Sequence, residues 1–293
     1  MVYTTGRYHL SNLLQDVYKK LGQYQAYPAT GGSATTAIVK QLEKKLSIDA
    51  GALFVVETSN NSAPEGEYER ITGYTKADGT FTVDSMNSIT SGDTVAIVND
   101  LFPLHTMVEL ANDAMRKLGD IVIVDTTTLD SASNKTEYAL AIAAKRNLLR
   151  VDVQTNTEDA NDNRWYTLFD VETIPANPGT AGLMILEQLS AGRDLRYWYG
   201  DTHPRLNTYD DFIDESINPE LAAIALTVTA LEWQWGRIKA DWVSQDLNKW
   251  SIELDKALQK WPIKRPPRKA RMITLPRVDD TPITGRPNLV NLT

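Results

Sequence analysis

The sequence contains no cysteine among its 293 residues. A disulfide-stapled fold, a thiolate metal site and a cysteine nucleophile are therefore excluded. Its apolar runs are short and interrupted by polar residues, so we expect no segment to span a membrane. Residues 1–8 lack a charged stretch followed by an apolar one, and we expect no signal peptide.

Residues that carry catalysis are also sparse. The only histidines, His9, His105 and His203, are far apart and show no metal-ligand spacing. No phosphate-binding loop, dinucleotide fingerprint, zinc-protease motif or nucleophile elbow occurs. The acidic stretch around Asn161 resembles a calcium loop but lacks its glycine and its final glutamate, which favours a solvated turn. We therefore predict a protein that is not an enzyme and that uses no cofactor and no metal.

The charge is distributed unevenly along the chain. The formal net charge is −8, and residues 260–293 hold eight basic and two acidic side chains. Removing this +6 from the total leaves −14 on residues 1–259. Six prolines between Pro262 and Pro287 prevent helix and central strand there. We expect an extended basic arm that becomes ordered against a partner.

The basic residues of this arm are its candidate partner-binding residues. They are Lys264, Arg265, Arg268, Lys269, Arg271 and Arg277. No aromatic residue is interleaved with the main basic run, which argues against base stacking. Phosphates and an acidic protein groove both remain open as targets.

Helical periodicity predicts two amphipathic helices before the C-terminal third of the chain. Apolar residues recur at helical spacing over 7–21, and Gly22 occupies the position of a left-handed C-cap. A second helix follows Pro103 and ends at Gly119, and Thr106 with Glu109 predicts a capping box at its start.

Two β-rich regions, residues 29–100 and 120–200, separate these helices from the last third. Their β-branched and aromatic runs predict strands at 35–39, 53–58, 68–75, 80–84, 94–98, 121–127, 148–154, 164–172, 183–187 and 194–199. Asp78-Gly79 predicts a hairpin turn, and residues 29–33 predict a loop. Small antiparallel sandwiches or barrels are the expected outcome.

The longest element begins at Pro219, after the N-cap candidate Asn218. Only Gly236 interrupts the helical pattern before Pro262, and about 42 residues at 1.5 Å each would span roughly 63 Å. One rod and a hairpin broken near Gly236 are both open. The candidate subunit-interface residues are its tryptophans Trp233, Trp235, Trp242 and Trp250. Tryptophans on two helix faces indicate burial by a partner or by flanking elements of the same chain.

The predicted fold class is α+β, with a helical core, two antiparallel β modules and an extended C-terminal arm. The predicted segments are an N-terminal helix at 1–28, a β module at 29–102, a helix at 103–119, a β module at 120–205, a Trp-rich helix or hairpin at 206–261 and the arm at 262–293.

Several strand and turn motifs resemble structural proteins of tailed bacteriophages. They are residues 66–74 (GEYERITGY), 79–83 (GTFTV), 91–95 (SGDTV), 190–199 (SAGRDLRYWY) and the ending 264–268 (KRPPR). In motifs and in layout the chain resembles the head-to-tail connector, or adaptor, proteins of the phage neck. This resemblance implies a ring, usually of twelve copies, beneath the portal protein. Helices would pack between neighbouring copies, and the arm would dock on the portal or on an adjacent subunit.

The functional hypothesis is therefore a structural virion protein made in the host cytoplasm and located in the neck, between capsid and tail. Its expected partners are the portal protein, further copies of itself and a tail or stopper/terminator protein. Double-stranded DNA would pass transiently and non-specifically, and no membrane is involved. The alternative is a tail or baseplate component whose β modules bind neighbouring proteins or host-surface glycans, with Tyr197, Trp198 and Tyr199 as stacking residues.

Overall fold

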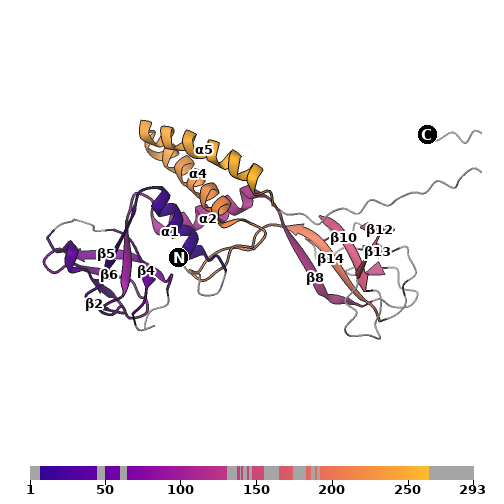
Figure 1. Cartoon of the computed structure of the whole chain (residues 1–293), viewed down its shortest axis with the longest axis horizontal. Coiled ribbons are helices and arrows are strands. Elements are labelled where there is room, and N and C mark those ends of the chain that lie inside the picture. The colour runs from indigo at the N-terminus through magenta and orange to yellow at the C-terminus, as the bar shows by residue number, and fades with distance from the viewer. Residues whose placement is uncertain are drawn as a thin grey trace, which may run out of the picture.

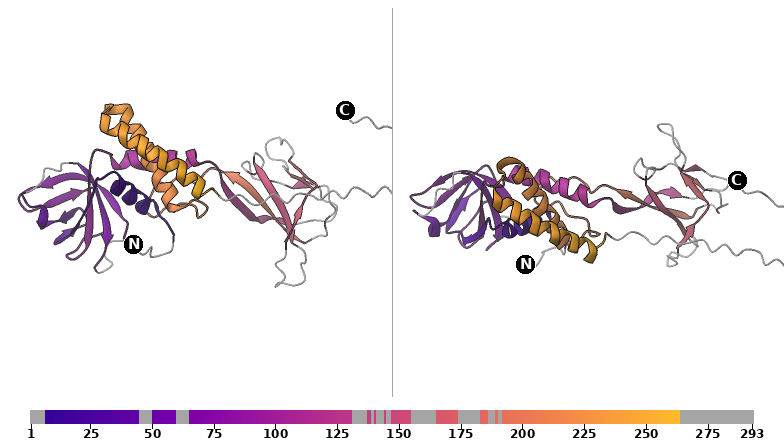
Figure 2. Two further views of the ribbon diagram at one scale, coloured as in Figure 1. Left: turned by 45° about the horizontal axis from the view of Figure 1, so that its top comes forward. Right: turned by 90° about the horizontal axis from the view of Figure 1, so that it is seen from above.

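The computed structural model describes residues 7–44, 50–59, 65–130, 137–138, 140, 144, 147–154, 165–173, 183–185, 189 and 192–263. Helices lie at the centre of the molecule, and a β module lies on each side of them (Figure 1). Two further views show the same elongated arrangement (Figure 2). The predicted α+β class is confirmed.

The helices are α1 (Leu10–Lys20), α2 (Leu104–Leu118), α4 (Pro219–Ile238) and α5 (Asp241–Lys260), with a 3-10 turn at Lys40–Leu42. Every residue of α4 from Leu221 to Leu231 is buried, as expected for a helix that is apolar on all sides. Helices α1, α2 and α5 all pack against it. Helix α4 is therefore the central element of the main core.

The element at 219–260 is a hairpin of two helices. The break falls at Lys239 and Ala240, three residues after Gly236. Lys239 has a left-handed backbone (φ 43°) and its N–H donates to the carbonyl oxygen of Trp235 at 3.2 Å. Because such a conformation is unusual for a lysine, the sequence contains no clear signal for a turn here.

The predicted capping box of the second helix is wrong. Helix α2 begins at Leu104, directly after Pro103, and no side chain caps its first turn. The φ of Pro103 is −59°, which suits the start of a helix. Thr106 therefore lies within the first turn rather than ahead of it.

The first sheet is antiparallel and seven-stranded, in the order β1-β7-β4-β5-β6-β3-β2. Its strands are β1 (Tyr24–Pro28), β2 (Gly31–Ser33), β3 (Thr36–Ile38), β4 (Gly51–Glu57), β5 (Tyr68–Thr75), β6 (Thr80–Val83) and β7 (Thr94–Asn99). Strands β1 and β2 were not predicted, and β2 lies within the expected loop at 29–33. The predicted turn at Asp78-Gly79 joins β5 to β6.

Strands β4 and β7 are buried on both faces. Phe54 and Val98 pack into the main core with the helices, whereas Leu53 and Val95 belong to a second core within the module. This double burial explains why both strands are almost continuously apolar in sequence. It also joins the first module firmly to the helices.

The second module contains two smaller antiparallel sheets, in the orders β11-β10-β14-β8 and β12-β13-β9. Its strands are β8 (Ile121–Asp130), β9 (Glu137–Tyr138), β10 (Leu148–Gln154), β11 (Trp165–Leu168), β12 (Val171–Thr173), β13 (Leu183–Ile185) and β14 (Asp194–Asp201). The single strand predicted at 164–172 is two strands in different sheets, which separate at Phe169 and Asp170.

Within the described ranges no sheet is closed, because each ends in two edge strands. The predicted sandwich or barrel form of the modules is therefore not confirmed. None of the helices among the described residues has the length and hydropathy needed to cross a bilayer.

Candidate functional site

The first candidate surface is the α4–α5 hairpin, where the four predicted interface tryptophans lie. Asn218 caps α4, since its Oδ1 accepts a hydrogen bond from the N–H of Glu220 at 2.9 Å. Pro219 follows at the first helical position. In α5 only Val243 and Ala257 are fully buried, so most of this helix faces away from the core.

The structure places these tryptophans in different surroundings. Trp233 packs on the main core, with its ring centroid 6.4 Å from that of Phe102, and Trp235 packs on the same core. Trp250 is half-buried, and the Nζ of Lys20 lies 5.3 Å from its ring centroid. Three of the four are therefore partly covered by the chain's own elements.

Trp242 differs from the other three. Its exposed fraction is 43%, and that of Ile238, on the other side of the turn, is 46%. The turn lies at the end of the hairpin remote from the second β module (Figure 1). An apolar pair at an exposed helical turn is the kind of surface that a partner buries.

The predicted arm follows the α4–α5 hairpin in the chain. Lys264, Arg265, Arg268, Lys269, Arg271 and Arg277 lie outside the described residues. The structure does locate the start of the arm, because Trp261 packs in the same cluster as Leu118, at the end of α2. The arm therefore leaves the helical core close to the start of the second module at Ile121.

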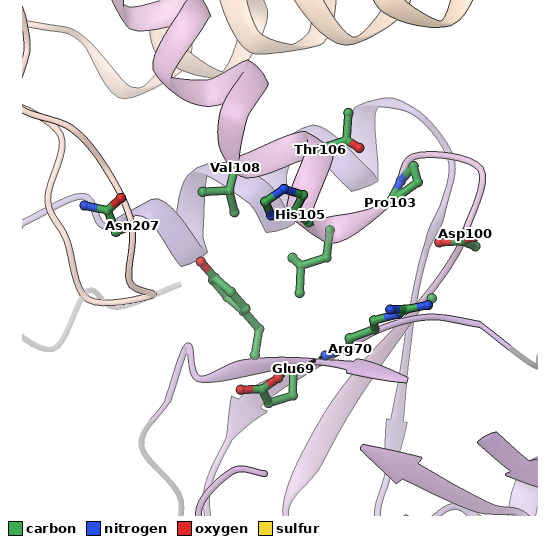
Figure 3. A pocket seen from close by; sticks show the side chains of 11 residues that line it. Glu69, Arg70, Asp100, Pro103, His105, Thr106, Val108 and Asn207 are labelled. Carbon is green, nitrogen blue, oxygen red and sulfur yellow. Dashed lines mark hydrogen bonds between the residues drawn. The ribbon is translucent and has the colours of Figure 1, made fainter. Parts of the chain in front are cut away.

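A cleft of about 470 Å³ lies between strand β5 and the start of helix α2. His105 and Val108 lie on its helical side, and Glu69 and Arg70 on its sheet side (Figure 3). The hydroxyl of Tyr68, which also lines the cleft, is buried and has no hydrogen-bond partner in the described structure.

Burial and nearby carboxylates set the protonation of two side chains that line this cleft. Burial, followed by the negative charges of Asp211, Glu69 and Asp210, raises the pKa of Tyr68 well above its ordinary value. Burial also raises the pKa of Glu69. Tyr68 is therefore protonated at neutral pH, and its unpartnered hydroxyl could serve a ligand as a hydrogen-bond donor but not as a base.

The histidines do not come together. His9 Nδ1 is 2.6 Å from the carbonyl oxygen of Asp210. His203 Nε2 accepts the N–H of Asp214 at 3.0 Å, so this ring holds the loop before α4. Across the described ranges, no three side chains of the kinds that ligate metals form a group.

The second candidate surface is the solvent-facing side of β10, β11 and β14. Asp152, on β10, is fully buried beneath it. Its carboxylate accepts hydrogen bonds from Arg150 Nε at 2.5 Å, Thr167 Oγ1 at 2.9 Å, Arg196 Nε at 3.0 Å and Trp198 Nε1 at 3.0 Å. Burial alone would raise the pKa of Asp152, but these four donors hold it below its ordinary value.

Strand alternation predicts that alternate members of Tyr197, Trp198 and Tyr199 are core, whereas the glycan hypothesis takes all three as exposed aromatics. Tyr197 and Tyr199 instead lie in the core of the second module, stacked with ring centroids 5.6 Å apart. Only Trp198 points to the solvent-facing side, because successive side chains of a strand alternate between its faces.

The sequence patterns did not lead us to predict that Arg150, Asp152 and Arg196 meet in one cluster. The available signal was the alternation along β10, where Val151 and Val153 are buried and the residues between and beside them are polar. Cross-strand partners decide which polar residues meet, and Asp152 lies opposite both Thr167 and Arg196. That pairing is not readable from one strand alone.

No family model matches the chain, and no curated protein is significantly similar to it.

Proposed function

We propose that this protein is a non-enzymatic structural protein of the phage neck, which forms a ring between the portal and the tail and continues the DNA channel. The observation that carries the proposal is the α4–α5 hairpin, whose Ile238 and Trp242 are exposed at its turn. A closed ring requires one contact repeated between neighbouring copies, and an exposed apolar turn can supply such a contact.

The layout of the molecule supports the proposal. The order helix, β module, helix, β module and long helical region is the layout in which the chain resembles neck adaptors (Figure 1). Many adaptors are small and nearly all-helical, so the two β modules would be large insertions in this chain. Residues 1–259 carry a net charge of −14. A negative wall would repel DNA rather than retain it, which suits a channel through which DNA moves.

The test is cryo-electron microscopy of the native particle, with the rotational symmetry around this protein as the measurement. A ring, expected to have twelve copies, between the portal and a narrower tube would support the proposal. Free protein is a weaker test, because such subunits can remain monomeric until a portal templates the ring. A trimer, or a six-fold ring far from the capsid, would contradict the proposal.

The alternative of a tail or baseplate component has one observation in its favour. The indoles of Trp165 and Trp198 are half-exposed on the open face of the second module. A pull-down of the intact protein on host cell-wall polymers tests this role. Polymer binding that requires these two indoles would favour the tail or baseplate role, provided that the protein is also found away from the neck.

A further inference from the structure

The solvent-facing side of the second sheet holds a chain of contacts between arginines and tryptophans. The guanidinium carbon of Arg196 lies 4.3 Å from the ring centroid of Trp165 and 5.4 Å from that of Trp198. The guanidinium carbon of Arg150 lies 5.5 Å from the centroid of Trp198. These distances fall within the range of cation–π contacts, so the four side chains hold one another in place.

The two guanidinium groups use only part of their bonding capacity. Each donates its Nε–H to Asp152, and within the described residues their terminal Nη groups make no hydrogen bond. The side chains are only 12% exposed for Arg150 and 23% exposed for Arg196. Two arginines and one carboxylate give this largely covered cluster a formal charge of +1.

A largely covered charge is costly unless an opposite charge completes it. The planar guanidinium is the side chain best suited to bind a carboxylate through two parallel hydrogen bonds. Asp152 and the indoles already fix the orientation of both groups, so little conformational entropy is lost when a ligand binds.

We propose that this Arg–Trp surface, formed by Arg150, Trp165, Arg196 and Trp198, is a binding site for an acidic segment of a partner protein. A carboxylate of that segment accepts hydrogen bonds from the Nη groups of Arg150 and Arg196. The site goes beyond the proposed ring contacts, because it lies on the second β module rather than on the helical hairpin.

A protein carboxylate fits this surface better than a nucleic acid or a glycan does. Bases and sugars bind through free aromatic faces, whereas Trp198 contacts two guanidinium groups and Trp165 contacts one. The negative charge on the rest of the chain also disfavours a long polyanion. A single carboxylate needs neither a free ring face nor an extended positive surface.

The experiment titrates the full-length protein with a blocked hexaglutamate peptide and follows the side-chain NMR signals of the two arginine Nε–H groups and of Trp198 Nε1–H. Hexaglutamine is the neutral control peptide. A double variant, Arg150→Lys with Arg196→Lys, keeps the charge but removes the planar fork. Arg205→Lys is the matched control, because Arg205 lies beyond the end of β14 and pairs with Glu109 of helix α2 rather than with the Arg–Trp surface.

We expect hexaglutamate to shift these signals saturably and hexaglutamine to leave them unchanged. Binding should weaken about tenfold or more in the double variant and remain unchanged in Arg205→Lys. Unchanged far-UV and indole spectra of the free double variant would show that it is folded. If the double variant does not fold, the wild type provides the criterion: the shifts caused by hexaglutamate should be lost at high salt.

Four results would overturn the assignment. One is the absence of shifts with hexaglutamate, and another is equal shifts with both peptides. The third is preferential binding of a short DNA duplex or of a sulfated glycan, offered at the same charge concentration. Binding that appears only after Glu158, Asp159 and Asp162 are neutralised would also overturn it, because the chain's own acidic segment would then be the occupant.

Discussion

Gly79 shows how a single residue determines a local structure. Its φ is +71°, and a Cβ placed there would run into the backbone carbonyl oxygen of Val39. Gly22 has a similar φ of +69° but no neighbour within 4 Å of such a Cβ. Both positions favour glycine for conformational reasons, and only Gly79 also requires it for space.

The two glycines form a matched pair for mutation. Gly22→Ala should lower the free energy of unfolding by about 1 kcal/mol, through backbone strain alone. Gly79→Ala should cost about 2 to 3 kcal/mol, because the clash adds to the strain. Urea unfolding of both variants measures the difference, and equal costs would contradict the close approach of Val39.

The ionised form of Asp152 stabilises the second module through its four hydrogen-bond donors. Its folded-state pKa is lowered, so its contribution to stability is complete above the unfolded pKa of about 3.9 and is lost as the pH falls through the folded value. Asp152→Asn should destabilise the module by about 3 kcal/mol at pH 7, since it leaves two arginines without their carboxylate.

Urea unfolding followed through the indole signals of Trp165 and Trp198 measures this loss. The difference in free energy of unfolding between the wild type and Asp152→Asn should become smaller as the pH is lowered below about 4. The control is Asp113→Asn, because Asp113 forms an exposed pair with Arg116 and should change stability by less than about 0.5 kcal/mol. A gap that does not depend on pH would contradict the role of the ionised carboxylate.

At the scale of elements, one part of the α4–α5 hairpin is buried in the core and stabilises the fold, and another part is exposed and available for assembly. Helix α4 is buried on all sides from Leu221 to Leu231, whereas its last turn is exposed and most of α5 faces outward. Lys239 at the turn adopts a left-handed backbone that glycine tolerates better. Lys239→Gly should therefore leave the free energy of unfolding unchanged or raise it by up to about 1 kcal/mol, as urea unfolding would show. A loss of stability would contradict the turn conformation.

The exposed apolar pair at this turn is predicted to act in assembly. Ile238→Ser with Trp242→Ser should change the thermal midpoint of the free protein little. It should reduce incorporation into particles, since buried tryptophans contribute about 2 kcal/mol or more to interfaces. Ile252→Ser, at a position 58% exposed on α5, is the control. Equal loss of incorporation in the control would contradict a specific role for the turn.

At the scale of the molecule, the helical core lies between two β modules and the basic segment begins beside the second one. Deletion of residues 262–293 should leave a folded protein, because the helices that form the main core all end before Pro262. The truncated protein should no longer join its partner particle. Circular dichroism checks the fold and particle complementation checks the function; unimpaired assembly would contradict the role of the arm.

Local sequence patterns were sufficient for the element types. Helical periodicity predicted α1, α2 and the 219–260 region, and the Asp78-Gly79 turn and the strands at 68–75 and 148–154 were also predicted correctly. These features depend on side-chain period, caps and turn residues that lie close together along the chain. The same reasoning missed β1 and β2, because short, half-exposed edge strands carry little hydrophobic signal.

Only the tertiary structure decided which residues meet. The break at Lys239, the division of residues 165–173 between two sheets and the convergence of Arg150, Asp152 and Arg196 all depend on strand pairing and helix packing. Local propensity contains no information about the register between β10 and β14, which are about 40 residues apart in sequence. The chain's own patterns thus determine its helices and strands, whereas long-range packing determines its surfaces, because a surface is assembled from segments that no local pattern connects.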